Sequence, residues 1–121
     1  MIQEIAAILK QLNATEGIKG SLIITPDGMP VASLLEGGQD MDTVAAISSS
    51  IYLSITKSME KLAIGDVNRY LLCTEFARFF IIGLGKMILI VLAAHNIQIA
   101  KVNVAIFQAA NAIKKSGRLD V

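Results

Sequence analysis

The feature that most constrains this fold is the run of residues 79–94, which is almost entirely apolar. A bilayer-spanning helix needs about 20 consecutive apolar residues, but two glycines and Lys86 interrupt this run in its middle. Two buried strands joined by a tight turn explain the pattern better, and we expect them over residues 76–83 and 87–93. Because the second strand lacks polar alternation, both of its faces should be covered, which predicts a central strand with helices above and below.

The composition points to either a membrane segment or a large interface between subunits. Hydrophobic residues make up 54% of the chain and charged residues only 17%, against about 45–50% and about 25% in typical globular domains. A soluble monomer would have too few charges to cover its surface. The 121 residues fit one domain, 1–121. The first residues lack the basic and apolar regions of a secretory signal, so we expect a cytoplasmic protein without membrane insertion.

The residues that could support catalysis or metal binding are few. One histidine, His95, excludes a multi-histidine metal site within one subunit, and one cysteine, Cys73, excludes an internal disulfide. Asp40 and Asp42 resemble paired carboxylates, but a helix N-terminus attracts acids through its dipole alone. A net charge of +1 argues against strong binding to nucleic acid. The sequence therefore predicts no catalytic residue, no cofactor and no metal.

The remaining segments alternate between helical and strand patterns. Turn chemistry at Pro26, Asp27 and Gly28 joins two apolar segments in a hairpin. Asp40 or Asp42 can cap the long helix that follows, and Gly65 is its stop signal. The predicted order is helix 1–13, strands 21–25 and 29–35, a helix to about residue 64, strands 67–73, 76–83 and 87–93, and a final helix that Asn96 caps. The final helix should bury Ile99, Val102, Ile106, Ala109 and Ile113. Short links between strands predict a mainly antiparallel sheet in an α+β fold.

The long helix has no charged residue from 43 to 56, which is unusual for a surface helix. Apolar residues fall on one side at helical spacing, and we expect that side to be core: Val44, Ile47, Ile51, Ile55 and Leu62. The other side consists of small or uncharged residues, where a partner could approach closely: Ala45, Ser48, Ser49, Tyr52, Thr56 and Met59. We predict that this side forms a dimer interface, with a solvated serine-rich face as the alternative. Strand 67–73, with Arg69, Leu71 and Cys73, reads as an edge strand that would join the interface.

Three segments together resemble the roadblock family, which includes the dynein light-chain roadblock proteins and prokaryotic relatives. Residues 22–33 are similar to its first hairpin, with an apolar strand, an Asp-Gly turn and a short apolar-Pro-small strand. Residues 45–50 are similar to its small-residue middle helix. Residues 91–93, followed by Asn96 and an amphipathic helix, resemble its closing arrangement. The resemblance covers essentially the whole chain.

This resemblance implies an α-β-β-α-β-β-β-α sandwich of the profilin and roadblock type. Its five-stranded antiparallel sheet would carry two helices on one face and one on the other. Roadblock domains form homodimers or heterodimers through the middle helices and third strands, and such dimers are platforms for small Ras-like GTPases or adaptors in motor and signalling complexes. The implied function is a non-enzymatic homodimer that binds and regulates a GTPase, with a pure adaptor as the alternative. An enzyme or a small-molecule sensor on a related fold is a third, less favoured class.

The arginines bear on how such a protein could activate a GTPase. One inserted arginine can stabilise the charge that develops during GTP hydrolysis. Arg69 lies on the expected edge strand, Arg78 in mid-strand and Arg118 near the end of the chain. None is well placed for insertion, so we expect any activation to work by positioning the partner's own groups.

Overall fold

The computed structural model describes residues 2–66 and 68–117, and it contains three helices and five strands in the predicted order. The elements are α1 (Ile2–Asn13), β1 (Ile18–Ile24), β2 (Pro30–Leu35), α2 (Met41–Leu62), β3 (Arg69–Cys73), β4 (Ala77–Gly83), β5 (Ile88–Ala94) and α3 (Ile99–Gly117). The strands form one sheet in the order β2-β1-β5-β4-β3, and all neighbouring pairs are antiparallel. The predicted antiparallel α+β fold is therefore confirmed, with β5 at the centre and β3 at an edge.

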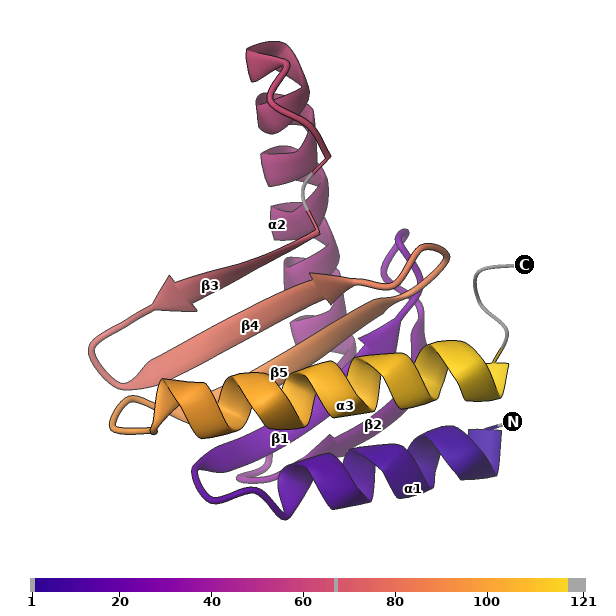
Figure 1. Ribbon diagram of the computed structural model, residues 1–121, viewed down its shortest axis with the longest axis vertical. Helices are drawn as coiled ribbons and strands as arrows, with labels where there is room; N and C mark the ends of the chain where they lie inside the picture. Colours follow the sequence, from indigo (N-terminus) through magenta and orange to yellow (C-terminus); the bar gives the residue numbers. More distant parts are fainter. Residues whose placement is uncertain (1, 67, 118–121) are drawn as a thin grey trace.

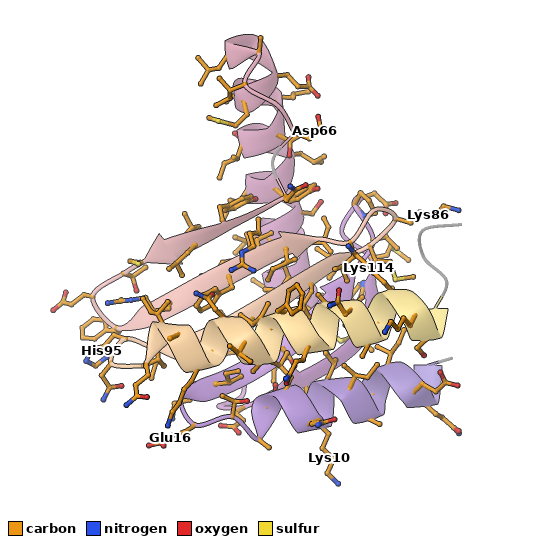
Figure 2. The ribbon with its side chains drawn as sticks, viewed as in Figure 1. Lys10, Glu16, Asp66, Lys86, His95 and Lys114 are labelled. Carbon is orange, nitrogen blue, oxygen red and sulfur yellow. The ribbon has the colours of Figure 1, made fainter. Side chains whose placement is uncertain are left out.

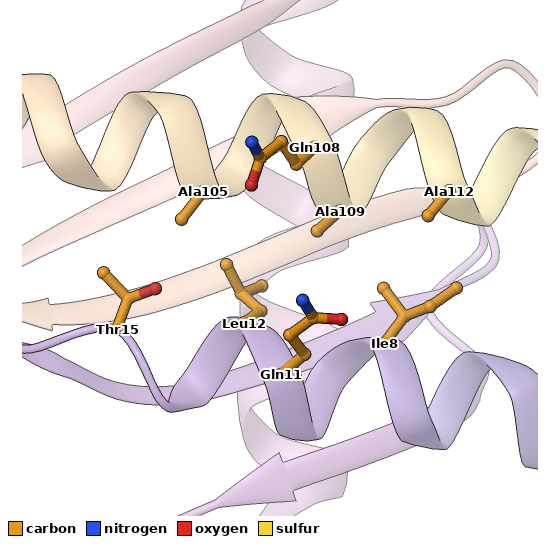
Figure 3. A pocket seen from close by; sticks show the side chains of 8 residues that line it. All are labelled: Ile8, Gln11, Leu12, Thr15, Ala105, Gln108, Ala109 and Ala112. Carbon is orange, nitrogen blue, oxygen red and sulfur yellow. The ribbon is translucent and has the colours of Figure 1, made fainter.

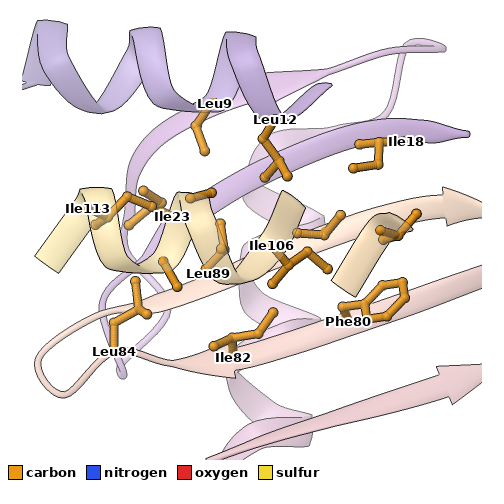
Figure 4. Packing of buried hydrophobic residues seen from close by; sticks show 14 of the residues in the cluster. Leu9, Leu12, Ile18, Ile23, Phe80, Ile82, Leu84, Leu89, Ile106 and Ile113 are labelled. Atoms are coloured by element: carbon orange, nitrogen blue, oxygen red, sulfur yellow. The ribbon is translucent and has the colours of Figure 1, made fainter. Parts of the chain in front are cut away.

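The sheet is covered on both faces, as predicted. Helices α1 and α3 lie side by side on one face, and α2 crosses the strands on the other (Figure 1). The larger apolar core fills the space between the sheet and the α1–α3 pair, where Leu9, Ile23, Leu89 and Ile106 are buried (Figure 4). A smaller core under α2 includes Ile24, Ala45, Ile81 and Ile90. Alternate residues of β1 and β5 thus enter opposite cores, which explains why neither strand has polar alternation.

Several predicted boundaries are wrong. Strand β1 begins at Ile18, not at residue 21, and includes Gly20, where its pairing with β5 is irregular. The start of α2 agrees with the prediction, because Asp40, one of the two expected caps, is its N-cap: its carboxylate accepts a hydrogen bond from the backbone N–H of Thr43 at 3.1 Å. The helix ends at Leu62, and its C-cap is Ala63 in a left-handed conformation with φ 54°, not the predicted stop signal at Gly65.

The start of α3 also differs from the prediction. The helix begins at Ile99, so Asn96 lies in the preceding turn and does not cap it. Ile99 is 43% exposed and is not a core residue. Val102, Ile106, Ala109 and Ile113 are buried as predicted. Residue 67, the predicted start of β3, lies outside the described residues.

Candidate functional site

Helix α2 packs on the sheet mainly with its small-residue side, which we had predicted to face a partner. Ala45 and Ser48 are fully buried and Ser49 is 5% exposed, whereas Ile47 and Leu62 of the predicted core stripe are 53% and 59% exposed. The expectation that the apolar stripe is core is therefore wrong for Ile47 and Leu62, and the expectation that the small-residue side faces outward is wrong for Ala45, Ser48 and Ser49. Val44, Ile51 and Ile55 of that stripe are half-buried. Val44 and Ile51 pack against the smaller core, as predicted.

The reason is the short distance between α2 and the β1–β2 hairpin. The hydroxyl of Ser49 donates a hydrogen bond to the carbonyl of Pro26 at 2.6 Å. Gly28 follows in the same turn with φ 93°, and a Cβ atom there would lie 3.3 Å from the Cβ of Ser49. Only small side chains fit between a helix and a turn this close, because larger ones would force the backbones apart. The small residues therefore serve packing within the chain.

The outer surface of α2 exposes large apolar side chains. Ile47 is 53% exposed, Leu53 46%, Leu62 59%, and Ile64 beyond the helix 72%. A helix of 22 residues is about 33 Å long, whereas five strands span about 19 Å across the sheet. The C-terminal half of α2 accordingly projects past β3 (Figure 1). An exposed apolar surface of this kind is typical of a protein interface.

Three predicted interface residues lie on the inner side of α2, toward this projecting half. Tyr52, Thr56 and Met59 are each half-buried. The Tyr52 ring stacks on that of Tyr70 in β3, with ring centroids 6.3 Å apart and planes at 22°. Among the described residues, the buried hydroxyls of Thr56 and Tyr70 have no hydrogen-bond partner. Burial, and secondarily the charge of Tyr52, raise the pKa of Tyr70 to about 12.

The predicted edge-strand residues occupy the other face of the sheet. Within the described residues, β3 pairs only with β4, so its outer edge has no strand partner. Leu71 packs against the larger core, and Cys73 is exposed. Arg69 is exposed and donates a hydrogen bond from Nη2 to the side-chain oxygen of Asn103 in α3 at 3.2 Å. The structure thus brings β3 close to Tyr52, while pairing of these residues with a second copy stays a prediction.

Charged side chains are dispersed around the fold and do not converge on a reaction centre. Figure 2 shows Lys10, Glu16, Asp66 and His95 at separate places on its periphery. His95 is exposed in the turn that follows β5. Across residues 2–66 and 68–117 there is no group of three or more histidine, cysteine or acidic residues that could hold a metal ion. In the same ranges, no helix has the length and apolar character to cross a bilayer.

The guanidinium of Arg78 is held by its own hairpin. Nη1 donates to the carbonyl of Thr74 at 2.8 Å and to that of Ala77 at 3.1 Å. These bonds fix the side chain across the β3–β4 turn. An arginine held in this way would have to break two hydrogen bonds before it could reach into a partner.

The face formed by α1 and α3 has a shallow groove between the two helices (Figure 3). Its volume is about 180 Å³, and its lining combines Gln11 and Gln108 with small alanines of α3. It has no charged lining residue, and we assign it no role.

Comparison with known proteins identifies the class that this architecture defines. Residues 4–94 match the Roadblock/LC7 domain. The chain belongs to the Roadblock/LC7 domain family. A curated relative, the uncharacterized protein MJ0310 of Methanocaldococcus jannaschii, is 29% identical over 107 residues, which cover 88% of this chain and 94% of that protein.

Two solved structures share the fold. MglB of Myxococcus xanthus superimposes with a TM-score of 0.92 at 13% identity and covers 99% of this chain and 92% of its own. A Roadblock/LC7 domain of Streptomyces avermitilis superimposes with a TM-score of 0.84 at 16% identity and covers 92% and 95%. The family expected from the hairpin, the middle helix and the closing segment is confirmed.

Two exposed apolar surfaces were not predicted from the sequence. One is the outer surface of α2, where we had placed Ile47 and Leu62 in the core. The other surrounds Phe107 on α3, which is 61% exposed. The sequence position of Phe107 could have indicated its exposure. It follows Ile106 directly and therefore lies off the buried stripe of the helix.

Proposed function

We propose that this protein is a non-enzymatic homodimer that binds and regulates a small Ras-like GTPase in the cytoplasm. The observation that carries the proposal is the exposed apolar surface of α2, which projects past a sheet edge with no strand partner. Membership of the Roadblock/LC7 family supports it, because roadblock dimers serve as platforms for such GTPases.

The dimer would form where β3 ends the sheet. A second copy that pairs its own β3 with this edge would continue the sheet beneath the projecting half of α2. Thr56 and Met59, on the inner side of that half, would then pack on the partner, and Arg69, Leu71 and Cys73 would lie along the seam. Two helices and an edge strand can supply the roughly 800 Å² per subunit that a stable interface buries. Ala45, Ser48 and Ser49 are excluded from this revised interface, because they are buried within their own chain.

The dimer is tested best by a matched pair of substitutions on α2. Thr56→Arg places a charge on the inner side of the projecting half, and Ser54→Arg places the same charge on an exposed position of the same helix. Light scattering should find a monomer for Thr56→Arg and a dimer for wild type and Ser54→Arg. A Thr56→Arg protein that remains a stable dimer contradicts the interface. Ser49→Arg would be a poor test, since its buried site would report loss of folding.

The GTPase would bind the composite outer surface of the paired α2 helices. Ile47 and Leu53 are exposed there and would contact the partner. Because Arg78 is held within its own hairpin, regulation would act by positioning the GTPase's own catalytic groups. The confinement of Arg78 to its own hairpin also favours a second candidate function. In that function the protein is an adaptor that binds a GTPase or another subunit without changing nucleotide turnover.

Hydrolysis assays separate these candidates. GTP turnover by Ras-like GTPases from the same genome would be measured with and without the protein, alongside a binding assay. Stimulation that survives Arg78→Ala but is lost with Ile47→Asp supports regulation through α2. Binding without stimulation identifies the adaptor. Normal binding with all stimulation lost in Arg78→Ala overturns the proposed mechanism, and absence of binding to any such GTPase overturns the function.

A further inference from the structure

A groove lies between α3 and the β3–β4 edge, on the sheet face opposite to α2. It consists of two adjoining hollows of about 220 and 330 Å³ that share Arg69, Ile82 and Ile106. Its floor is apolar, with Leu71, Phe80 and Ile82 from the strands and Ile106 from the helix. The groove exists because α1 and α3 cover the β2-β1-β5 side of the sheet more completely than the β3 edge (Figure 1).

The helical wall of this groove exposes apolar surface without an evident role in the chain's own core. Phe107 lines the groove and is 61% exposed, and Val104, one turn earlier on α3, is 57% exposed. Removing apolar surface from water is favourable roughly in proportion to the area buried. A partner segment that covered Phe107 would therefore gain substantial binding free energy from one contact.

The charges around the groove have one sign. Arg69 and Lys114 line it, and none of the residues lining the two hollows is aspartate or glutamate. Helix α3 as a whole has three lysines and no acidic residue. Figure 2 shows Lys114 on α3 beside the sheet.

The arginine is also held in position for an anion. The hydrogen bond to Asn103 at 3.2 Å fixes its guanidinium at the groove. Since a guanidinium has five N–H donors, others remain available for a carboxylate. Within residues 2–66 and 68–117, neither Arg69 nor Lys114 forms an ion pair with an acidic residue.

We infer that this groove binds a segment of a partner protein that combines acidic and apolar residues. Its apolar side chains would cover Phe107 and the floor, and its carboxylates would pair with Arg69 and Lys114. A second copy of the chain is disfavoured as the occupant, because two α3 helices would bring their lysines together. Nucleic acid is disfavoured because its affinity depends on many phosphate contacts, and the groove offers two cations. The inference does not rest on the proposed GTPase function, since α2 lies on the other face. Arg69 and Leu71 also adjoin the proposed dimer seam, so light scattering must show that Arg69→Gln associates as wild type does.

The test begins with selection of a random displayed peptide library on the immobilised full chain. Selected peptides should be rich in acidic and apolar residues. A short fluorescent peptide in which leucine and glutamate alternate would then be titrated and followed by anisotropy, with leucine–lysine and serine–glutamate peptides as probes of charge and of apolar contact. Binding of the leucine–glutamate peptide should weaken as salt rises, and the other two should bind poorly.

Two groove variants and one control complete the test. Phe107→Ser should weaken binding by about tenfold, and Arg69→Gln should weaken it and reduce its salt dependence. Lys115→Gln, on the same helix but outside the groove lining, should bind as wild type. Selection of no peptide or of basic peptides, or wild-type binding by Phe107→Ser, overturns the inference. Loss of self-association in Phe107→Ser by light scattering also overturns it, because a second copy would then be the occupant.

Discussion

Two adjacent serines of α2 should respond in opposite directions to the same substitution. Ser48 and Ser49 are both buried, at 0% and 5% exposure. The hydroxyl of Ser49 donates to the carbonyl of Pro26, whereas that of Ser48 has no hydrogen-bond partner among the described residues. Replacing each with alanine removes the same atom from the same helix, so that the main difference is the fate of one hydrogen bond.

The expected magnitudes follow from these environments. Ser49→Ala leaves the part-buried carbonyl of Pro26 without its partner, which costs up to about 1–3 kcal/mol, partly offset by a gain in helix propensity of about 0.5 kcal/mol. We expect the free energy of unfolding to fall by about 1–2 kcal/mol. Ser48→Ala removes a hydroxyl whose burial without a hydrogen bond costs about 1–3 kcal/mol, and it gains the same propensity. We expect the free energy of unfolding to rise by about 1 kcal/mol or more.

Urea unfolding followed by circular dichroism would measure both variants against wild type. Protein concentration must be equal in all samples, because self-association makes apparent stability concentration-dependent. The midpoints should move to opposite sides of the wild-type value with unchanged slopes. Shifts of the same sign, or a Ser48→Ala protein less stable than wild type, would refute the packing of α2 on its small-residue side.

Three further predictions concern the ends of elements and the edge strand. Hydrogen bonds from the first turn of α2 hold the pKa of Asp40 below its ordinary value of 3.8. The stabilising effect of this carboxylate should be complete above pH 3.8 and lost as the pH falls through the lower pKa of the folded state. Asp40→Ala should therefore lower the melting temperature at pH 7 more than in acid. The pKa of Tyr70 is raised from 10.0 to about 12. The free energy of unfolding should decline as the pH rises through that interval, because Tyr70 ionises in the unfolded chain first. Urea titrations should show a smaller decline in Tyr70→Phe. Gly17 has φ 94°, and a Cβ there would lie 2.4 Å from a side-chain carbon of Ile97, whereas Gly37 has φ 76° and open space around it. Thermal unfolding should find Gly17→Ala clearly less stable than Gly37→Ala. Equal losses of stability in the two variants would contradict the close packing at Gly17.

The sequence predicted the sheet well because its evidence is local. The unbroken apolar character of β5 required burial on both faces, and the interruption at Lys86 required a turn, whichever elements lie around them. Turn residues at Pro26 and Gly28 likewise identify a hairpin without knowledge of its surroundings. The order of the elements and the family resemblance followed from such signals.

The orientation of α2 could not be predicted in the same way. A helical pattern with isoleucines on one side ordinarily indicates the buried side, yet here Ile47 is exposed and Ser48 is buried. The deciding quantity is the distance between the helix and the β1–β2 turn, which a tertiary contact between Ser49 and Pro26 sets. The apolar stripe thus lies at the flank of the helix and is half-exposed, and in the proposed complexes a partner protein would bury its exposed part.

The central place of β5 also affects how the protein forms during synthesis. Strand β1 pairs with β2 on one side and with β5 on the other, and its residue Ile24 meets Ile88 in β5. At about 5–20 residues per second, a ribosome takes several seconds to make the roughly sixty residues between them. During that interval the N-terminal hairpin has an apolar strand with an open edge, which is the arrangement most prone to pairing with other nascent chains. Folding on the ribosome therefore has a vulnerable period whose length the strand order dictates, and slow translation of residues 36–87 should increase aggregation more than slow translation of α3.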